Sequence, residues 1–505
     1  MWVVAAQALR GFEPPVERLD TAWKAVLLNQ FHDILPGSSI HRVHEEAEAS
    51  YAAAIDTARE ITSHAISCLT GGTQGDDQAV TVFNSLSWER TELVALPDTF
   101  GEGRAASETG GLLPVQVIDG RPWVEATVPP CGWTTLRPAP APTPANAREP
   151  ADGLRATEGL LENAHLQVKF NASGEVTRLF DKDVGRELAA GPCNRFRMYK
   201  DVPAAWDAWD LDSMYALTPV ELEDRASIEV VAEGPLVATI RVSRRLNQST
   251  MTQEISLRRG SRRVDFRTSV DWQESHKLLK IDFPVHIHTH EAIHEIQFGH
   301  IRRPNHRSRP FDADRFEVCN HKWTAIAEEN RGFAVLNDCK YGVNVLGNSV
   351  NLTLLKSALA PDMTADRGLQ AFTYALYTWN GSFADSPVVR EAYALNCPVV
   401  TAPGAAGEGS LGFRSAFTVD APNVIIETVK PAEDGSADVI VRLYESKRTA
   451  TRCTLSTALP VLGAAQTDMM ERVTGELPCE DGRVELEFRA FEVKTVRLRM
   501  GGGIV

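Results

Sequence analysis

The stretch Asn29–Ser39, NQFHDILPGSS, ends an amphipathic segment and places a His–Asp pair beside the break. Before the break, apolar residues recur at helical spacing (Trp23, Leu27, Phe31 and Ile34). Pro36–Gly37 cannot continue a helix, because proline lacks the backbone N–H and glycine favours a helix end. His32 and Asp33 are therefore predicted to lie on the last turn and to project from the helix end.

The residue types of this pair suggest two chemical uses. An imidazole at a helix end can bind a metal ion, and a neighbouring carboxylate can accept hydrogen bonds from the hydroxyls of a polyol. Judged on residue types alone, a helix cap or a solvated surface pair is the commoner use of His32 and Asp33. The surrounding sequence has to decide between these readings.

Residues 1–72 are predicted to be helical. A second helix is expected to begin near Ser39, a good N-cap residue, and to end at Gly71–Gly72. Its apolar positions recur every three or four residues (Val43, Ala47, Ala54, Ala58, Ile61, Ala65 and Leu69). Helices with one apolar stripe each make an incomplete bundle, so we expect the stripes to need a partner.

After residue 72 the pattern changes to short alternating runs separated by turn residues, which predict strands. The proline-rich stretch Arg137–Pro150 and the glycine-rich stretch Ala402–Gly412 mark two joints. We expect a small β-sandwich at 73–150, a large antiparallel β-sandwich at 151–400 and a C-terminal β-sandwich at 401–505. The predicted fold class is mainly β with an N-terminal α-helical segment: a helical-bundle piece followed by multiple antiparallel β-sandwich domains.

Composition narrows the range of partners. The formal charge is −15 and no long Lys/Arg run occurs, which argues against nucleic acid or an anionic membrane. No apolar run in the sequence reaches the length of a membrane span, and nothing near Met1 reads as a signal peptide. The eight scattered cysteines include no Cys-x-x-Cys pair, a pattern typical of reduced thiols. We therefore expect a cytoplasmic protein, and a homo-oligomer is compatible with these features.

A second candidate cluster is rich in tryptophan and aspartate. Trp206 and Trp209 can offer an apolar platform to a sugar ring, and Asp207 and Asp210 can accept hydrogen bonds from its hydroxyls. A turn with buried tryptophans and capping aspartates explains the same residues equally well. Asn194, just upstream, is a further candidate of the same kind.

Three histidines alternate in the sequence HIHTH, namely His286, His288 and His290. On a strand they share one face and can bind a metal ion. A solvent-facing stripe near a strand end is the simpler interpretation, and we prefer it.

Several blocks of the chain resemble one enzyme family. The segment around His32 closely resembles the metal-ligand motif of the α-mannosidases of glycoside hydrolase family 38. Further blocks resemble successive parts of the same family, most of all its cytosolic and bacterial branch (FNSLSWER at Phe83–Arg90, KDVPAAWDAWDLD at Lys200–Asp212, DWQESHKLLKIDFP at Asp271–Pro284 and a longer block at Phe316–Gly342). Their order and approximate spacing agree, so the resemblance covers nearly the whole chain.

The resemblance implies a retaining hydrolysis of terminal α-linked mannose from oligosaccharides. In that family a divalent ion, usually zinc, grips two hydroxyls of the mannose ring through two histidines and two aspartates. His32 matches the histidine that the helical domain supplies, and Asp33 matches the aspartate that holds sugar hydroxyls. The family's rim loop from the β-domain favours a substrate-binding role for Asn194, Trp206, Asp207 and Asp210.

The sequence also departs from the family. No His-x-His-x-Asp string occurs, and 31 residues precede His32. We therefore expect the catalytic nucleophile, the acid/base and three metal ligands to lie outside this chain, on a missing N-terminal domain or subunit. One imidazole cannot hold zinc alone, so the isolated chain is expected to be inactive and to bind no zinc tightly.

Two alternatives remain open at this point. One is a non-catalytic carbohydrate-binding or accessory β-sandwich protein, which has no need of a helix ending in a metal-ligand motif. The other is one subunit of a split mannosidase, in which exposed apolar stripes on the helices form the docking surface.

Overall fold

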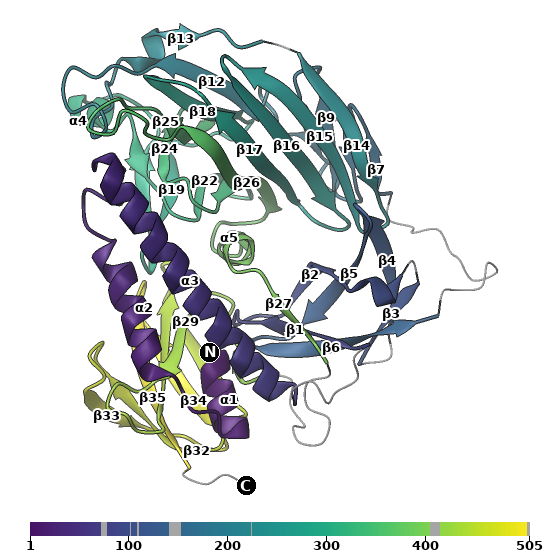
Figure 1. Ribbon diagram of the computed structural model, residues 1–505, viewed down its shortest axis with the longest axis vertical. Helices are drawn as coiled ribbons and strands as arrows, with labels where there is room; N and C mark the ends of the chain where they lie inside the picture. Colours follow the sequence, from purple (N-terminus) through teal and green to yellow (C-terminus); the bar gives the residue numbers. More distant parts are fainter. Residues whose placement is uncertain are drawn as a thin grey trace.

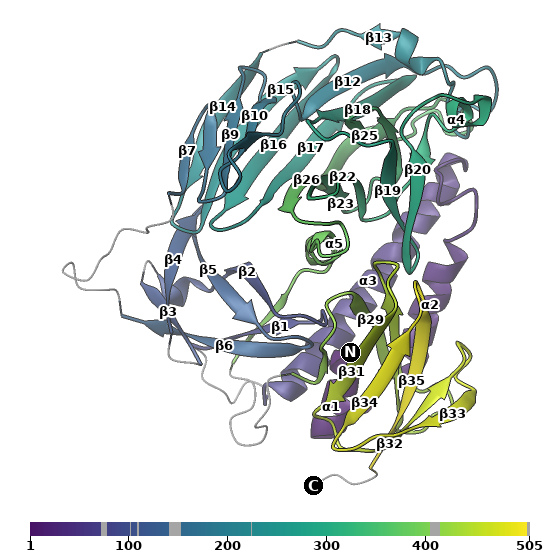
Figure 2. The ribbon, with the colours of Figure 1, turned by 180° about the vertical axis from the view of Figure 1, so that it is seen from behind.

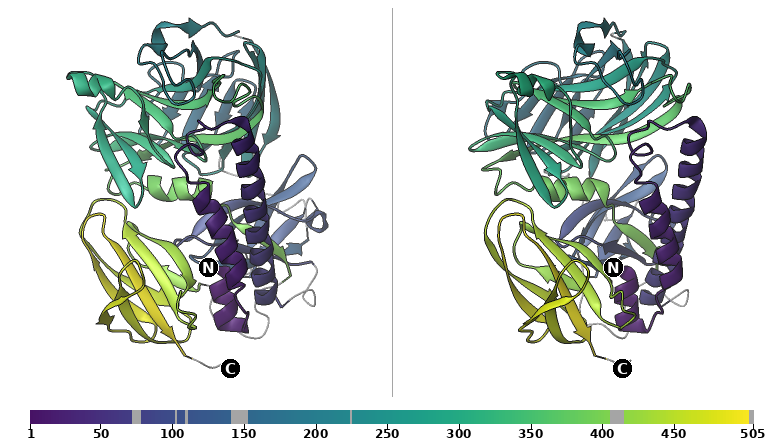
Figure 3. Two further views of the ribbon diagram at one scale, coloured as in Figure 1. Left: turned by 60° about the vertical axis from the view of Figure 1, so that its left-hand side comes forward. Right: turned by 90° about the vertical axis from the view of Figure 1, so that its left-hand side faces the viewer.

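The structure is a computed structural model, and it describes residues 1–71, 78–101, 103–108, 111–140, 153–223, 225–404 and 415–501. Within these ranges the chain is built mainly from antiparallel strands and opens with helices (Figure 1). The helices run lengthwise beside the β-domains, as both views of Figure 3 show. The predicted fold class is confirmed.

The N-terminal helices are α1 (Trp2–Arg10), α2 (Val16–Leu28) and α3 (His41–Leu69). Helix α3 begins two residues after the predicted cap, Ser39. The Ser39 hydroxyl instead donates to the backbone carbonyl of Asp33 at 2.8 Å, so it does not cap the helix, and Ile40 takes the cap position without a side-chain bond. At the other end Gly71 adopts a φ of 79°, a left-handed conformation that suits glycine after a helix.

Helices α1 and α2 differ in burial. Helix α1 buries Trp2 and Val4 with two alanines, and the Trp2 ring packs edge-on to Phe83 with 5.0 Å between ring centroids. Val4 also contributes to the core of the C-terminal sandwich, next to which α1 lies in Figure 2. Helix α2, all of whose residues the structure describes, has no buried residue.

The first sheet follows the helices and is completed by a strand from much later in the chain. Its strands run in the order β2-β5-β4-β3-β6-β1-β27. They are β1 (Val80–Asn84), β2 (Arg90–Ala95), β3 (Arg104–Ser107), β4 (Leu112–Ile118), β5 (Arg121–Val128), β6 (Gly132–Ala139) and β27 (Val400–Pro403). A short 3₁₀ helix, η2 (Asp98–Phe100), covers part of this sheet's core. The strand at 400–403 therefore pairs with the sheet of residues 80–139, although the whole large sandwich separates the two in the sequence.

The large sandwich encloses the main hydrophobic core between one broad sheet and two smaller ones. The broad sheet, called the large sheet below, comprises β14 (Ala226–Glu233), β15 (Val237–Leu246), β16 (Ser249–Arg258), β17 (Arg263–Trp272), β19 (Glu291–Ile296), β20 (Gly299–Pro304), β22 (Trp323–Glu328), β23 (Arg331–Asn337) and β26 (Gly368–Asn380). One opposing sheet comprises β7 (Arg155–Thr157), β8 (Leu160–Glu162), β9 (Leu166–Phe170), β10 (Val176–Asp181) and β11 (Arg186–Glu187). The other comprises β12 (Arg195–Lys200), β13 (Pro219–Val220), β18 (Lys277–Pro284), β21 (Val318–Cys319), β24 (Gly342–Leu346) and β25 (Ser349–Lys356). Alternating burial along strands such as β9 and β17 explains why the period-two pattern predicts them.

The C-terminal sandwich packs two further sheets around its own core. Its strands are β28 (Phe417–Val419), β31 (Thr451–Thr457) and β34 (Arg483–Phe488) in one sheet, and β29 (Val424–Pro431), β30 (Val439–Glu445), β32 (Val461–Thr467), β33 (Val473–Leu477) and β35 (Val493–Met500) in the other.

Helix α5 (Val388–Asn396) lies where the first sheet, the large sandwich and the C-terminal sandwich meet (Figure 1). We call this contact region the junction; its core includes Trp88, Trp323, Phe383 and Tyr444. The sequence patterns did not predict α5, nor the one-turn helices α4 (Pro310–Asp314) and η4 (Tyr215–Leu217).

Parts of three predicted segments lie outside the described residues: 141–150 of the proline-rich joint, 405–412 of the glycine-rich joint, and Gly72 at the predicted helix end. The closing residues 502–505 lie outside them too. Among the helices that the structure does describe, none combines the length and the apolar character that a membrane crossing needs.

Candidate functional site

His32 and Asp33 lie just beyond helix α2, in a series of turns rather than on its last turn. The helix ends at Leu28, since Asn29 turns its side chain back: the amide donates to the Ala25 carbonyl at 3.1 Å and to the Ser50 hydroxyl at 3.1 Å. Turn hydrogen bonds then follow as far as Ser38, whose N–H donates to the Asp33 carbonyl at 3.2 Å. We call the connection between α2 and α3, residues 29–40, the hairpin end. The pair projects from this connection, whereas the prediction placed it on the last turn of the helix.

The two side chains are close together and open to solvent. The His32 Nε2 atom lies 3.6 Å from Asp33 Oδ2, and the imidazole is 68% exposed. The Ser38 hydroxyl donates to Asp33 Oδ1 at 3.4 Å. The ring of His32 also faces that of Trp209 edge-on, with 6.4 Å between centroids, so the structure brings the hairpin end and the predicted tryptophan loop together.

A cleft of about 990 Å³ lies between these two segments. We call it the tryptophan cleft. Its walls come from the hairpin end, from the loop after β12, from His276 and from a segment after β25 (Asp33, Ser38, 202–209, His276 and 359–361). Most of this lining is apolar, with carboxylates and an imidazole at defined points, which is the usual character of a small-molecule site.

The loop that carries the tryptophans is fixed by its own hydrogen bonds. The Trp206 carbonyl accepts from the N–H groups of Trp209 and Asp210, both at 2.8 Å. Trp206 itself adopts a φ of 57°, a left-handed conformation that is rare for an aromatic residue. Trp206 is 76% exposed and Trp209 is 57% exposed, so both residues are free to meet a ligand rather than buried in a turn.

Asp207 anchors this loop to the opposite wall. Its Oδ2 atom accepts from the N–H of Leu359 at 2.6 Å, from the N–H of Ala360 at 3.2 Å and from His276 Nε2 at 3.1 Å. Partial burial works against ionisation, but the Leu359 and His276 contacts outweigh it and hold the pKa of Asp207 below its usual range. Asp207 thus caps a backbone segment, as the structural interpretation anticipated, while it also lines the cleft.

Two predicted residues lie elsewhere. Asp210 is exposed but opens onto a neighbouring hollow with Met214 and Arg307 instead of the cleft. Contrary to the prediction, Asn194 lies inside the large sandwich: it is 2% exposed, donates to Gln253 Oε1 at 2.8 Å and accepts from the Tyr374 hydroxyl at 2.6 Å. A buried amide whose partners are all interior cannot contact a ligand in the cleft.

His276 and the 359–361 segment complete the site and were missed from the sequence alone. His276 lies in the block Asp271–Pro284 that carries part of the family resemblance, but no local pattern marks it. A second link, His41 Nδ1 to Asp362 Oδ2 at 3.1 Å, ties the start of α3 to the same segment. The hydrogen bond to Asp362 raises the pKa of His41.

Two exposed imidazoles lie at this end of the helices, those of His32 and His41, and Asp362 already engages His41. A zinc site in proteins takes at least three protein ligands. Within the described ranges, no group of three or more His, Cys, Asp or Glu side chains is arranged to hold a metal ion, and this includes the exposed His286, His288 and His290. Within the described residues, His32 alone therefore does not make a zinc site.

Comparisons with known proteins match three regions of the chain. Residues 1–69 match the description "Alpha mannosidase middle domain", residues 161–364 match "Glycosyl hydrolases family 38 C-terminal domain", and residues 423–496 match "Glycosyl hydrolases family 38 C-terminal beta sandwich domain". The three matched regions follow the helical segment, the large sandwich and the C-terminal sandwich.

Individual relatives extend these matches to nearly the whole chain. The chain is 36% identical over 495 residues to alpha-mannosidase 2C1 of Homo sapiens, covering 96% of this chain and 46% of that protein. It is 29% identical to alpha-mannosidase G of Dictyostelium discoideum, covering 97% of this chain and 48% of that protein. An alpha-mannosidase structure from Enterococcus faecalis shares the fold, with a TM-score of 0.80, 18% identity, and coverage of 98% of this chain and 65% of that one. The chain spans about half the length of the curated relatives it matches.

Proposed function

Because the chain belongs to glycoside hydrolase family 38, whose middle, C-terminal and β-sandwich domains it carries, we propose that it forms the C-terminal part of a retaining α-mannosidase. The reaction is the hydrolysis of terminal α-linked mannose from oligosaccharides. The observation that carries this proposal is the His32–Asp33 pair at the mouth of the tryptophan cleft. The eight cysteines, none of them in a disulfide, favour a reducing compartment, so we place the protein in the cytoplasm.

Each cleft residue has a role in this proposal. His32 would supply one imidazole ligand to a zinc-type ion, and that ion would act as a Lewis acid toward hydroxyls of the mannose ring. Asp33 accepts hydrogen bonds from hydroxyls of the same sugar, where a charge-assisted bond is strong. Trp206 and Trp209 pack against the apolar face of the sugar ring or of its neighbour, and Asp207 keeps their loop in place.

The nucleophile and the acid/base group lie outside these 505 residues in this proposal. A retaining glycosidase needs two carboxyl groups about 5 Å apart. The carboxylates that line the cleft are Asp33 and Asp207, and Asp207 is already engaged with the 359–360 amides. The relatives carry about as much polypeptide again beyond the matched region, which is room for a domain that bears both groups.

Helix α2 offers the surface on which that polypeptide docks. Large apolar side chains are exposed along the helix and its continuation (Val16, Trp23, Leu27, Leu28 and Phe31). An apolar patch of this kind marks a protein contact rather than a solvated face. Because the patch runs directly into His32 and Asp33, a domain that covers it brings its own groups to the mouth of the tryptophan cleft. Whether that domain is on the same polypeptide or on a separate subunit is what the first experiment decides.

The first experiment measures the mass of the native polypeptide in its source cells with an antibody raised against this chain. A band at about twice 55.4 kDa supports a single longer polypeptide. A band at 55.4 kDa supports a split enzyme, and a partner that co-purifies through α2 is then expected. If that short form binds α-mannobiose and brings no partner with it, a non-catalytic carbohydrate-binding protein replaces our proposal.

The second experiment tests the roles of the site residues in the native enzyme, with release of mannose from α-mannobiose as the readout. His32→Ala is expected to lower both the zinc content and kcat/KM by about 100-fold or more, since it removes a metal ligand. Asp210→Ala, a matched change outside the cleft, is expected to leave both unchanged. Stoichiometric zinc or mannosidase activity in the isolated 505-residue chain would contradict the proposed division of the catalytic groups.

A further inference from the structure

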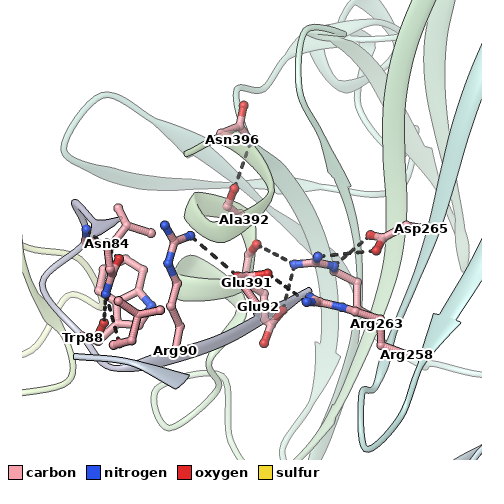
Figure 4. Close-up of polar contacts among 12 residues, drawn as sticks. Asn84, Trp88, Arg90, Glu92, Arg258, Arg263, Asp265, Glu391, Ala392 and Asn396 are labelled. Carbon is pink, nitrogen blue, oxygen red and sulfur yellow. Dashed lines mark hydrogen bonds and ion pairs between the residues drawn. The ribbon is translucent and has the colours of Figure 1, made fainter. Parts of the chain in front are cut away.

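Arg90 is buried at the junction without a hydrogen-bond acceptor. It opens strand β2, its side chain is 5% exposed, and within the described residues none of its Nε, Nη1 and Nη2 atoms has a hydrogen-bond partner. In Figure 4 its guanidinium lies beside the turn of α5 that carries Glu391 and Ala392. A buried donor left unpaired destabilises the folded state, and a charged one destabilises it more. These N–H donors are therefore available to a further acceptor.

The protein itself cannot remove this charge. A buried lysine can become neutral by losing a proton, whereas an arginine side chain stays protonated in proteins. The nearest carboxylate, Glu92, has Oε1 at 3.6 Å from Arg90 Nη1, which is beyond hydrogen-bond distance. Its other oxygen, Oε2, already accepts from Arg258 Nη1 at 2.8 Å. The Cys397 thiol is also close to Arg90, but burial raises the pKa of that thiol, so it carries no negative charge.

The other carboxylates of the cluster are engaged as well. Glu391 accepts from Arg263 Nη1 at 3.1 Å, and Asp265 accepts from Arg263 Nε at 2.8 Å. A further guanidinium, that of Arg390, lies 5.3 Å from the centre of the Trp88 ring. Burial is the cause that lowers the pKa of Arg390, and no carboxylate offsets it. The carboxylates beside these guanidinium groups therefore already have cationic partners, and none of them is within hydrogen-bond distance of Arg90.

We propose that the junction binds a small monovalent inorganic anion of the chloride class on the guanidinium of Arg90. The enclosed position favours a halide over a sugar or a large oxyanion, because a bulky ligand cannot reach a side chain that is 5% exposed. The anion supplies the missing acceptor and a negative charge beside the buried guanidinium. Since Arg90 belongs to the first sheet and faces α5 and the large sheet, the bound anion joins the parts of the molecule that meet there. This inference does not depend on the proposed hydrolase activity.

The test is thermal unfolding of the purified chain while sodium chloride replaces sodium isethionate at constant ionic strength. The organic sulfonate is too large for the site, so it serves as the non-binding anion. Above the dissociation constant, each tenfold rise in chloride is expected to raise the unfolding midpoint by about 1 °C. Arg90→Leu should lose this dependence. Arg267→Leu, which removes an exposed guanidinium from the large sheet, should keep it.

A measurement on the unmodified protein covers the case in which Arg90→Leu fails to fold. Crystals grown in sodium bromide are expected to show an anomalous peak within hydrogen-bond distance of the Arg90 guanidinium. Absence of that peak overturns the proposal and assigns the Arg90 donors to water. An unfolding midpoint that ignores chloride, or one that responds equally in Arg90→Leu, overturns it too.

Discussion

The hairpin end and the junction distribute their residues in opposite ways. At the hairpin, α2 and the turns after it expose large apolar side chains, while His32 and Asp33 are solvated. At the junction, tryptophans are covered and charged groups such as Arg263 are buried among their partners. Apolar and charged side chains thus have different roles in the two regions. At the junction they hold the domains together, and at the hairpin they stay exposed and available for contacts with another molecule or domain.

The largest effect is expected from a tryptophan at the junction. Trp323 is 1% exposed and packs against Phe383 with 5.7 Å between ring centroids. Trp323→Ala should lower the free energy of unfolding by about 3–5 kcal/mol, measured by urea denaturation. Trp23→Ala, the matched change on exposed α2, should stay within about 0.5 kcal/mol of the unmodified chain. Similar losses at both positions would remove the distinction between the two regions.

A buried charge gives the next largest effect. Arg263 in the large sheet binds Asp265 and Glu391, so Arg263→Leu leaves two carboxylates without their cation. We expect a loss of about 3 kcal/mol in the free energy of unfolding. Arg267→Leu, four residues along the same strand and exposed, serves as the control and should change stability little. An unchanged free energy of unfolding in Arg263→Leu would mean that the charged cluster does not stabilise the contact between the domains.

Lys447 sharpens the same contrast through pH. Burial lowers the pKa of Lys447 to about 7, although Glu445 lies near it. A lysine whose folded pKa is depressed gives a contribution that is fully present above pH 10.5, its unfolded value, and is lost as the pH falls toward 7. The free energy of unfolding should therefore rise by up to about 1.4 kcal/mol per pH unit across this window. Lys447→Met should remove that rise; equal slopes in the two proteins would show that Lys447 is already neutral or already charged in both states.

The smallest effect is expected at the hairpin, where His41 meets Asp362. The hydrogen bond to Asp362 raises the pKa of His41, so the stability that this pair contributes is present below pH 6.5 and is lost as the pH rises through the folded pKa. An NMR titration of the imidazole should give a pKa above 6.5, and Asp362→Asn should bring it back toward that value. An unchanged pKa in Asp362→Asn would mean that the two walls of the cleft are not linked through His41.

Local pattern was enough to predict most of the fold. Strands such as Leu166–Phe170 and Leu278–Phe283 alternate or cluster apolar residues in a way that burial within the sandwich explains. The helical segment and its break at Pro36–Gly37 were likewise visible in the sequence. The exact end of α2 was not, because Asn29 is fixed by Ser50, a residue of the next helix.

The site was predictable in composition but not in assembly. Sequence patterns and the family resemblance singled out Asp33, Trp206 and Asp207, which line one cleft. They could not show that Asn194 turns inward, since its partners Gln253 and Tyr374 are far away in sequence. Contacts of this kind depend on tertiary packing, which no local period encodes.

The pairing of β1 with β27 has a consequence for how the molecule is made. The Thr81 hydroxyl donates to the carbonyl of Gly404, and 323 residues separate them in the sequence. At a synthesis rate of about 5–20 residues per second, roughly 16–65 s pass before the ribosome delivers the partner strand. Throughout that interval the edge of β1 at Val80–Phe83 remains unpaired, with the backbone groups that seed aggregation available to any other nascent strand. The chain therefore depends on protection of the β1 edge during synthesis, and a shortage of chaperones should lower the yield of folded protein before it alters any finished molecule.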